Sequence, residues 1–158
     1  MNWEIEDIVN EYSKMIFQIA FQNTFIKSVA EDITQEVLIK VWKNIKHIKD
    51  DNHLKAWLIR VTINACKDSN RKYDKKEVPL EETEIEYFDK ETSEIFEELK
   101  KLKPINRNII YLYYYEGYTI KEISKILKMN ANTVSTNLKR ARKELKNILE
   151  EGGDNYEG

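Results

Sequence analysis

Residues 118–149, YTIKEISKILKMNANTVSTNLKRARKELKNIL, decide the fold of the C-terminal half of the chain. Thr119 followed three residues later by Glu122 is the pattern of a capping box, which predicts the start of a helix. Apolar residues then recur at helical spacing as far as Leu127. Lys128 and Met129 predict a turn, after which Asn130 can cap a second helix. The stretch therefore predicts two helices joined by a tight turn.

The second predicted helix separates apolar from polar side chains. Steps of four and three residues build one apolar stripe, from Val134, Leu138, Ala141, Leu145 and Ile148. The other faces carry polar and basic side chains: Thr133, Ser135, Thr136, Asn137, Lys139, Arg140, Arg142 and Lys143. This is the plan of a helix-turn-helix, whose second helix enters the DNA major groove while basic residues contact phosphates. A helical hairpin with a solvated basic face is the alternative interpretation.

The composition favours an all-α, soluble protein. The chain has 158 residues, 34% charged and 41% hydrophobic, with only four glycines and two prolines. Its single cysteine, Cys66, forms no internal disulfide and suits a reducing cytosol. The N-terminus lacks a signal-peptide pattern, and no stretch approaches the roughly 20 apolar residues that span a bilayer. We therefore expect a cytoplasmic protein that does not insert into membranes.

The sequence contains no pattern typical of an enzyme or a cofactor site. It lacks a glycine-rich phosphate loop, a nucleophile elbow and paired carboxylates near a histidine. His47 and His53 have no partner at metal-ligand spacing, so they predict loop histidines rather than a zinc site. We expect no catalytic residues, no metal and no cofactor.

Charge is segregated along the chain, although the formal net charge is only −2. Residues 43–76 contain 10 basic and 4 acidic side chains, and residues 99–149 contain 12 and 3. Between them, residues 77–98 contain 1 basic and 10 acidic side chains. Two basic blocks separated by an acidic stretch predict two modules that face nucleic acid.

The N-terminal half predicts three helices around a small core. The first carries apolar residues at helical spacing from Trp3 to Ala20, and Asn23 and Thr24 predict a break or a bend. The third runs from Leu54 to about Arg71. Between them, the helix AEDITQEVLIKVWKNI (residues 30–45) is expected to bury Ile33, Val37, Leu38, Val41, Trp42 and Ile45. Trp42 and Trp57 are interpreted as core anchors. Residues 46–52 predict a loop.

These patterns divide the chain into two small helical domains. We expect a first domain over residues 1–72, an acidic flexible linker over 73–93, a second domain over 94–150 and an acidic tail over 151–158. Pro104 splits two further helices of the second domain, and Gly117 supplies a helix stop before the helix-turn-helix.

Three segments, in this order and spacing, resemble bacterial sigma-70-family factors of the small extracytoplasmic-function (ECF) type. AEDITQEVLIKVW is similar to the family's helix that binds core RNA polymerase. HLKAWLIRVTINACKD resembles the helix that melts and recognises the −10 promoter element. LKPINRNIIYLYYYEGYTIKEISKILKMNANTVSTNLKRARKEL resembles the domain that recognises the −35 element.

The resemblance assigns roles to the first domain. The family docks this helix onto a coiled coil of the polymerase's largest subunit. The positions that match its docking residues are Asp32, Gln35, Glu36, Ile39 and Lys40. The family flips one base of the single-stranded −10 element into a pocket. That pocket is assigned to a loop wall of Lys49, Asp50 and Asp51 and a helix side of Asn64 and Asp68. The phosphates of the same strand are expected to be bound by Arg60, Lys67, Arg71 and Lys72. Merely solvated helix faces are the alternative interpretation.

The resemblance also assigns the double-stranded −35 contacts. They fall on Ser135, Thr136, Asn137, Lys139 and Arg140, with Thr133, Arg142 and Lys143 supporting them. The family commonly has basic residues where Ser135 and Asn137 stand, so a promoter sequence is not transferred. It also favours glycine at the position of Lys128. If that backbone needs a positive φ, lysine costs about 1 kcal/mol there.

The function expected from the resemblance is a sigma factor that binds core RNA polymerase and promoter DNA, with an anti-sigma factor as a further partner. One alternative is an ordinary helix-turn-helix regulator, which a homodimer footprint on palindromic DNA without polymerase would favour. Another is a helical interaction protein that does not bind DNA, such as a sequestering partner. Absence of all salt-sensitive DNA association, even with polymerase present, would favour it.

Overall fold

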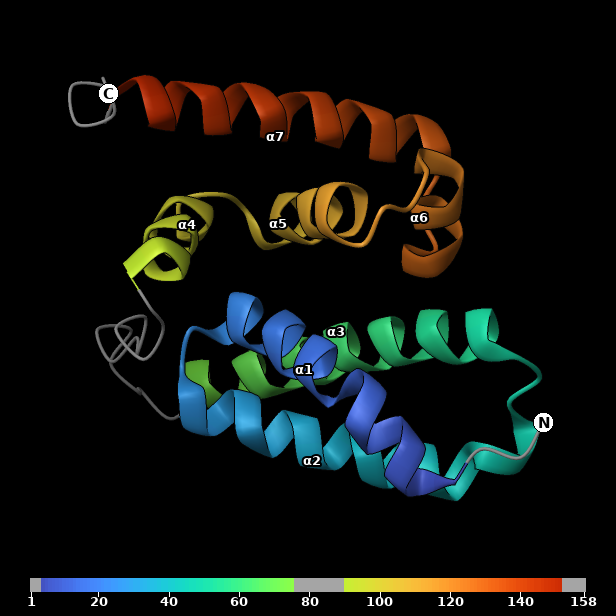
Figure 1. Cartoon of the computed structure of the whole chain (residues 1–158). Coiled ribbons are helices and arrows are strands. Elements are labelled where there is room, and N and C mark those ends of the chain that lie inside the picture. Colours follow the sequence, from blue (N-terminus) through green and yellow to red (C-terminus); the bar gives the residue numbers. More distant parts are fainter. Residues whose placement is uncertain (1–3, 76–89, 152–158) are drawn as a thin grey trace. The chain divides into compact units, whose positions relative to one another are not determined.

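The computed structural model describes residues 4–75 and 90–151; within these ranges, the side chains of residues 70–75, 91–93, 95 and 148–151 lie outside the description. The chain forms two compact units, Met1–Ile85 and Glu86–Gly158 (Figure 1). Every secondary-structure element in the described ranges is a helix, as the composition predicted. None of these helices combines the length and the apolar character that crossing a bilayer requires.

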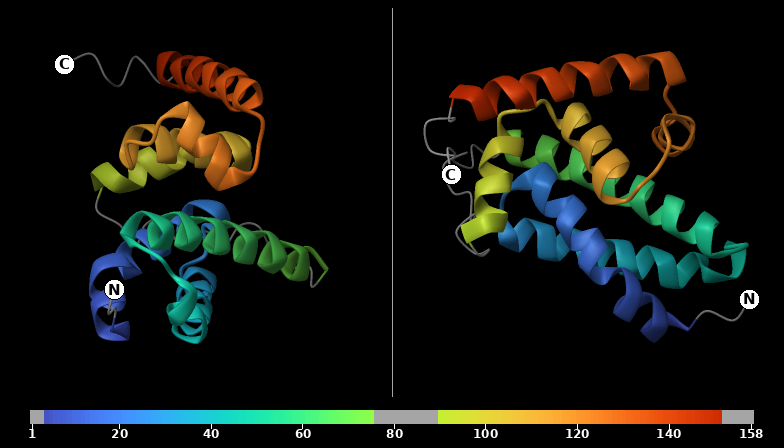
Figure 2. Two further views of the ribbon diagram at one scale, coloured as in Figure 1. Left: turned by 90° about the vertical axis from the view of Figure 1, so that its right-hand side faces the viewer. Right: turned by 45° about the horizontal axis from the view of Figure 1, so that its top comes forward.

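The first unit contains α1 (Ile5–Thr24), α2 (Lys27–Asn44), the short 3₁₀ turn η1 (Ile45–His47) and α3 (Asp51–Lys75). Each of the three long helices packs against the other two (Figure 2). Fully buried apolar side chains from all three form the core: Ile8, Ile16, Ile19, Phe21, Val37, Val41, Leu54, Leu58 and Ile59. The predicted three-helix arrangement is confirmed.

The chain reverses between α1 and α2 at Phe25, directly after Thr24, where α1 ends as the sequence predicted. Asn23 and Thr24 stay helical, with their side chains donating to the backbone oxygens of Ile19 and Ala20. Phe25 has a left-handed backbone (φ 57°), and its N–H donates to Phe21 O at 2.7 Å. Its side chain is buried, which holds the reversal against the core.

Trp42 is not a core residue, and the prediction that placed it there is wrong. Its side chain is 64% exposed, whereas Val37 and Val41 are fully buried and Leu38 and Ile45 are half-buried. The buried stripe of α2 follows steps of four residues through Ile33, Val37 and Val41. The neighbouring position 42 turns away from that narrow stripe, because successive helical residues are rotated by about 100°.

The predicted loop of residues 46–52 is shorter in the structure, because α3 starts at Asp51. Asp50 caps this start: its Oδ1 accepts from His53 N–H at 2.7 Å, and its carbonyl accepts from Leu54 N–H at 2.9 Å. The helix then continues to Lys75, beyond the predicted end near Arg71.

The second unit contains α4 (Lys90–Lys100), α5 (Pro104–Ile110), the π-helical turn η3 (Tyr111–Tyr115), α6 (Ile120–Leu127) and α7 (Ala131–Glu151). The long α7 runs along α4, α5 and α6 (Figure 1). Both ends of the predicted linker are helical, in α3 and α4, while residues 76–89 lie outside the described residues. The tail beyond residue 151 also lies outside them.

The predicted features of the helix-turn-helix are confirmed. Glu122 N–H donates to Thr119 Oγ1 at 3.1 Å, and Thr119 N–H donates to Glu122 Oε1 at 3.0 Å, which completes the capping box. Lys128 ends α6 in the left-handed region at φ 54°. Asn130 Oδ1 accepts from Asn132 N–H at 2.8 Å and caps α7. The capping box fixes the start of α6, and the Lys128 backbone and the Asn130 cap define the turn into α7.

Candidate polymerase and nucleic-acid interfaces

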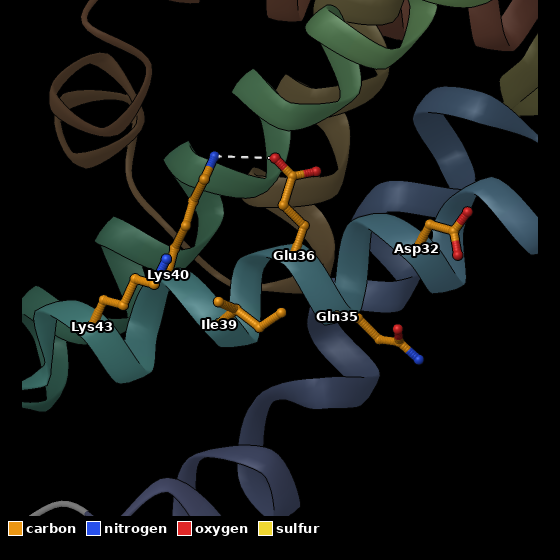
Figure 3. Close-up of a pocket in the computed structure, with 6 residues that line it drawn as sticks. All are labelled: Asp32, Gln35, Glu36, Ile39, Lys40 and Lys43. Atoms are coloured by element: carbon orange, nitrogen blue, oxygen red, sulfur yellow. Dashed lines mark ion pairs between the residues drawn. The ribbon is translucent and has the colours of Figure 1, made fainter.

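The residues expected to bind polymerase lie together on the exposed side of α2. Asp32, Gln35, Glu36, Ile39 and Lys40, with Lys43, line a shallow open depression of about 350 Å³ (Figure 3). Ile39 is 54% exposed, which is unusual for a large apolar side chain without a partner. Lys40 Nζ lies 3.3 Å from Glu36 Oε1, so charged groups border the apolar residue. An apolar centre with a charged rim is typical of a protein interface.

The sequence interpretation missed two residues of this face. Trp42 follows Ile39 by three positions and Gln35 by seven, so all three side chains project from the same side of α2. Lys43 lines the depression directly. The spacing of Trp42 from Gln35 was visible in the sequence, but its size and hydrophobicity favoured a core position.

The first group expected at the −10 element surrounds the start of α3. Lys49, Asp50 and Asp51 are all exposed. Asp50 is committed to the helix cap, and Lys49 N–H donates to His53 Nδ1 at 3.1 Å. His53 therefore holds the backbone of this segment through both its own N–H and its ring, a role that its sequence position did not predict.

The second group lies further along α3. Asn64, Lys67 and Asp68 are exposed and Arg60 is half-exposed, while Ile63, Ala65 and Cys66 between them are buried. Arg60, Asn64 and Lys67 follow steps of four and three residues and therefore share one face. The predicted Arg71 and Lys72 are on α3, but their side chains lie outside the described residues.

The structure keeps these two groups apart. Asn64 follows Asp51 by thirteen residues of one continuous helix, a distance of about 20 Å along the axis. Because Lys49 is bonded to His53, it stays at the same end as Asp51. The loop wall and the helix side therefore do not enclose one base-sized pocket in this structure.

The residues expected at the −35 element line α7 on two faces beside its buried stripe. Val134, Leu138 and Ala141 are buried, as predicted. One exposed face follows steps of three, four and three residues, through Thr133, Thr136, Arg140 and Lys143. The flanking face carries Ser135, Lys139 and Arg142. Asn137 is half-buried between the first face and the core. The exposed cations leave α7 able to contact phosphates and base edges.

The lone cysteine is a packing residue. Cys66 is 1% exposed, and its Sγ–H points to Ala20 O at 4.0 Å. Burial, followed by the nearby Glu36 carboxylate, raises the pKa of the thiol to about 12. A thiol in this state is a poor nucleophile and a poor metal ligand at neutral pH.

Comparison with known proteins gives two family matches, one for each unit. Residues 8–76 match the model of Sigma-70 region 2, and residues 92–145 match that of Sigma-70 region 4. The first match contains the α2 and α3 groups described above. The second contains the whole helix-turn-helix and the basic faces of α7.

Two curated relatives match this chain over most of their length. The chain is 30% identical over 159 residues to the ECF RNA polymerase sigma factor SigM of Bacillus subtilis, which covers 94% of this chain and 96% of the relative. It is 28% identical over 141 residues to RNA polymerase sigma factor SigV of the same species. That alignment covers 85% of this chain and 84% of SigV.

Solved structures share the fold at lower sequence identity. The sigma factor RpoE, in complex with the anti-sigma factor NepR from Bartonella quintana, has a TM-score of 0.75 at 21% identity, covering 92% of this chain and 96% of RpoE. CnrH, in complex with the cytosolic domain of CnrY, has a TM-score of 0.69 at 20% identity, covering 93% of this chain and 88% of CnrH. Family models, relatives and fold agree: the chain belongs to the sigma-70 family, as an RNA polymerase sigma factor of the ECF type.

Proposed function

We propose that this sigma factor docks onto core RNA polymerase through the exposed face of α2. The observation that carries the proposal is the pair of exposed apolar side chains, Ile39 (54%) and Trp42 (64%), in a charged surround. Aromatic side chains at the centre of an interface contribute most of its binding energy. The occupant is the coiled coil of the polymerase's largest subunit, onto which sigma-70 factors dock. Asp32, Gln35, Glu36 and Lys40 form the polar rim that orients it.

We propose that α3 engages the −10 element in single-stranded form. The amide of Asn64 is exposed and can both donate to and accept from the edge of an unstacked base. Asp68 lies one turn further on and accepts only. Arg60 and Lys67 supply positive charge on the same side of the helix for the phosphates. Arg71 and Lys72, whose side chains lie outside the described residues, are proposed for the same phosphates from the sequence alone.

The segment before α3 has a separate role in this proposal. Asp51 lies about 20 Å from Asn64 along α3, and Lys49 and Asp50 are bonded to His53 near the same end. This group therefore contacts a different nucleotide of the strand from the one that Asn64 recognises. Asp50, already committed to the α3 cap, acts by fixing the backbone of Lys49 and Asp51 rather than by binding a base itself.

We propose that α7 recognises the double-stranded −35 element. The face of Thr133, Thr136, Arg140 and Lys143 meets the major groove, with Arg140 able to bind a guanine edge through two hydrogen bonds, worth about 1–3 kcal/mol of discrimination. Lys139 and Arg142 on the flanking face contact phosphates, and Ser135 and Asn137 add hydrogen bonds. The capping box and the Asn130 cap present the α7 N-terminus to DNA without further ordering.

Further proposals follow from this function. The protein is cytoplasmic, where polymerase and chromosomal DNA are found, and it contributes binding rather than a catalytic activity of its own. An anti-sigma factor is a further partner, as NepR is for the sigma factor RpoE, which shares the fold. Such a partner would regulate by competing for the surfaces that bind polymerase.

Size-exclusion chromatography with bacterial core RNA polymerase tests the docking proposal. We expect the wild-type chain to co-elute with polymerase at micromolar concentration. The double variant Asp32→Ala/Gln35→Ala should co-elute less, and a matched pair on the exposed side of α1, Glu6→Ala/Asn10→Ala, should behave as wild type. Equal co-elution of all three would show that the exposed face of α2 is not the docking surface.

A further inference from the structure

Two adjacent tyrosines of η3 hold a basic side chain of α7. The guanidinium carbon of Arg142 lies 5.3 Å from the ring centre of Tyr113 and 5.4 Å from that of Tyr114. The two rings meet edge to face, with centres 4.9 Å apart and planes at 78°. Both distances are within the range in which a cation is attracted by the negative face of an aromatic ring. One guanidinium is therefore held by two rings at once.

The π-helical turn explains how consecutive residues can share one cation. Glu116 N–H donates to Tyr111 O at 3.1 Å, a bond that spans five residues instead of four. A wider turn rotates successive side chains by less than an α-helix does, so Tyr113 and Tyr114 diverge less. The turn is braced by Tyr111, whose ring stacks on Tyr115 at 5.0 Å and whose hydroxyl donates to Glu116 Oε1 at 2.9 Å.

Arg142 retains its capacity to bind an anion in this arrangement. Among the residues whose side chains the structure describes, none forms an ion pair with it. The five N–H donors of a guanidinium form a planar fork that matches phosphate. The rings attract the cation but offer it no anionic oxygen, so contact with them restricts the side chain and leaves its charge available to a phosphate.

The position of Arg142 places this fork beside the expected DNA surface. It lies on the flanking face of α7, three residues after Lys139 and seven after Ser135, and it is exposed. A free arginine loses about 2 kcal/mol of rotamer freedom when it is fixed. Because the two rings already restrict Arg142 in the unbound protein, less rotamer entropy is lost when the side chain binds DNA.

We propose that Tyr113 and Tyr114 are positioning residues that hold the Arg142 guanidinium ready for a DNA phosphate flanking the −35 element. This inference rests on the proposed DNA-binding role of α7. It adds two residues that do not themselves need to touch DNA. Because the aromatic ring alone supplies the attraction, phenylalanine should replace either tyrosine, whereas leucine should not.

The experiment measures the affinity of the sigma factor, in complex with core polymerase, for a promoter fragment recovered by transcription of sheared genomic DNA. Tyr114→Leu is the main variant, because Tyr114 is 58% exposed and its replacement leaves the core intact. Tyr113→Leu is the second variant, and the two phenylalanine variants are the matched controls. Dissociation constants are measured over a range of salt concentrations, with and without Arg142→Ala.

We expect each leucine variant to weaken binding by about two- to fivefold, the effect of losing one exposed cation–π contact. Arg142→Ala should lower the slope of log affinity against log salt by about 0.9, the loss of one phosphate contact. In that background, the leucine variants should have no further effect, and the phenylalanine variants should match wild type throughout.

Each contrary result is distinguishable. Wild-type affinity in the leucine variants, or leucine and Arg142→Ala effects that multiply, would overturn the positioning role and leave the DNA-binding role of α7 standing. Weaker binding in the phenylalanine variants would assign the effect to the hydroxyls and likewise overturn it. If the wild-type complex shows no salt-sensitive promoter binding, the proposed function of α7 is overturned, and this inference with it.

Discussion

Trp42 lies three residues after Ile39 on α2, and both side chains are largely exposed, at 64% and 54%. The helix thus presents two large apolar groups on the same face as Gln35, away from the stripe of Val37 and Val41 that closes the core. An exposed pair of this size is unfavourable in water and becomes favourable when a partner covers it.

Replacing Trp42 by alanine should therefore weaken polymerase binding without weakening the fold. We expect a loss of about 2 kcal/mol in binding, or roughly 30-fold, as for aromatic residues at interface centres. Thermal stability should change by less than about 0.5 kcal/mol, because the ring is not part of the core. Immobilised core polymerase gives the affinity, and Lys14→Ala on α1 is the control. Unchanged affinity, or a large fall in the melting temperature, would return Trp42 to a structural role.

Glycine at position 128 should stabilise the second unit. Lys128 has a left-handed backbone at φ 54°, which costs a residue with a Cβ about 1 kcal/mol relative to glycine. Lys128→Gly should therefore raise the free energy of unfolding by about that amount, measured by chemical denaturation. Lys125→Gly, in the last turn of α6, is the matched control and should destabilise by about 1 kcal/mol. Destabilisation by both variants would show that the backbone at Lys128 is not strained.

The capping box should make the stability of α6 depend on pH. Hydrogen bonds from Thr119, first through its backbone N–H, lower the pKa of Glu122 in the folded protein. Its contribution is then complete above the unfolded pKa and is lost as the pH falls through the lowered folded pKa. The melting temperature of Glu122→Ala should lie below that of wild type at pH 7, and the gap should close in acid. A gap that stays constant across this range would contradict the ionic contribution.

Alanine substitutions of Asn64 and Lys67 should affect opening of the −10 element in different ways. Asn64→Ala removes hydrogen bonds to an unstacked base and should slow promoter opening by about tenfold, with no change in salt dependence. Lys67→Ala removes a phosphate contact and should lower the salt slope by about 0.7, the single-strand value. Permanganate reactivity of unpaired thymines, followed over time at several salt concentrations, separates the two. Identical profiles for both variants would contradict the division between base and phosphate contacts.

The helix-turn-helix was predictable because its determinants are local. Thr119, Glu122 and Asn130 act on backbone groups two or three residues away, so sequence spacing alone identifies their bonds. Even the left-handed backbone at Lys128 could be anticipated from the family's glycine. The polar and apolar division of α7 followed from helical periodicity in the same way.

Features that depend on packing between helices were not predictable. Whether Trp42 turns inward depends on the width of the groove that α1 and α3 offer to α2, which a single helix pattern does not contain. The start of α3 at Asp51 depends on the Asp50 cap, which adds residues 51–53 to the helix between Lys49 and Asn64. The contact of Arg142 with Tyr113 and Tyr114 joins elements about thirty residues apart through a π-helical turn that no residue pattern announces.

Transcription with purified components tests whether this protein directs promoter-specific initiation by RNA polymerase. Core RNA polymerase alone, and core polymerase with this protein, are compared on sheared genomic DNA, and the 5′ ends of the transcripts are mapped. We predict defined start sites that appear only with the protein, preceded by shared sequence elements near −35 and −10. Transcripts that are the same with and without the protein, despite a stable complex with polymerase, would contradict this prediction.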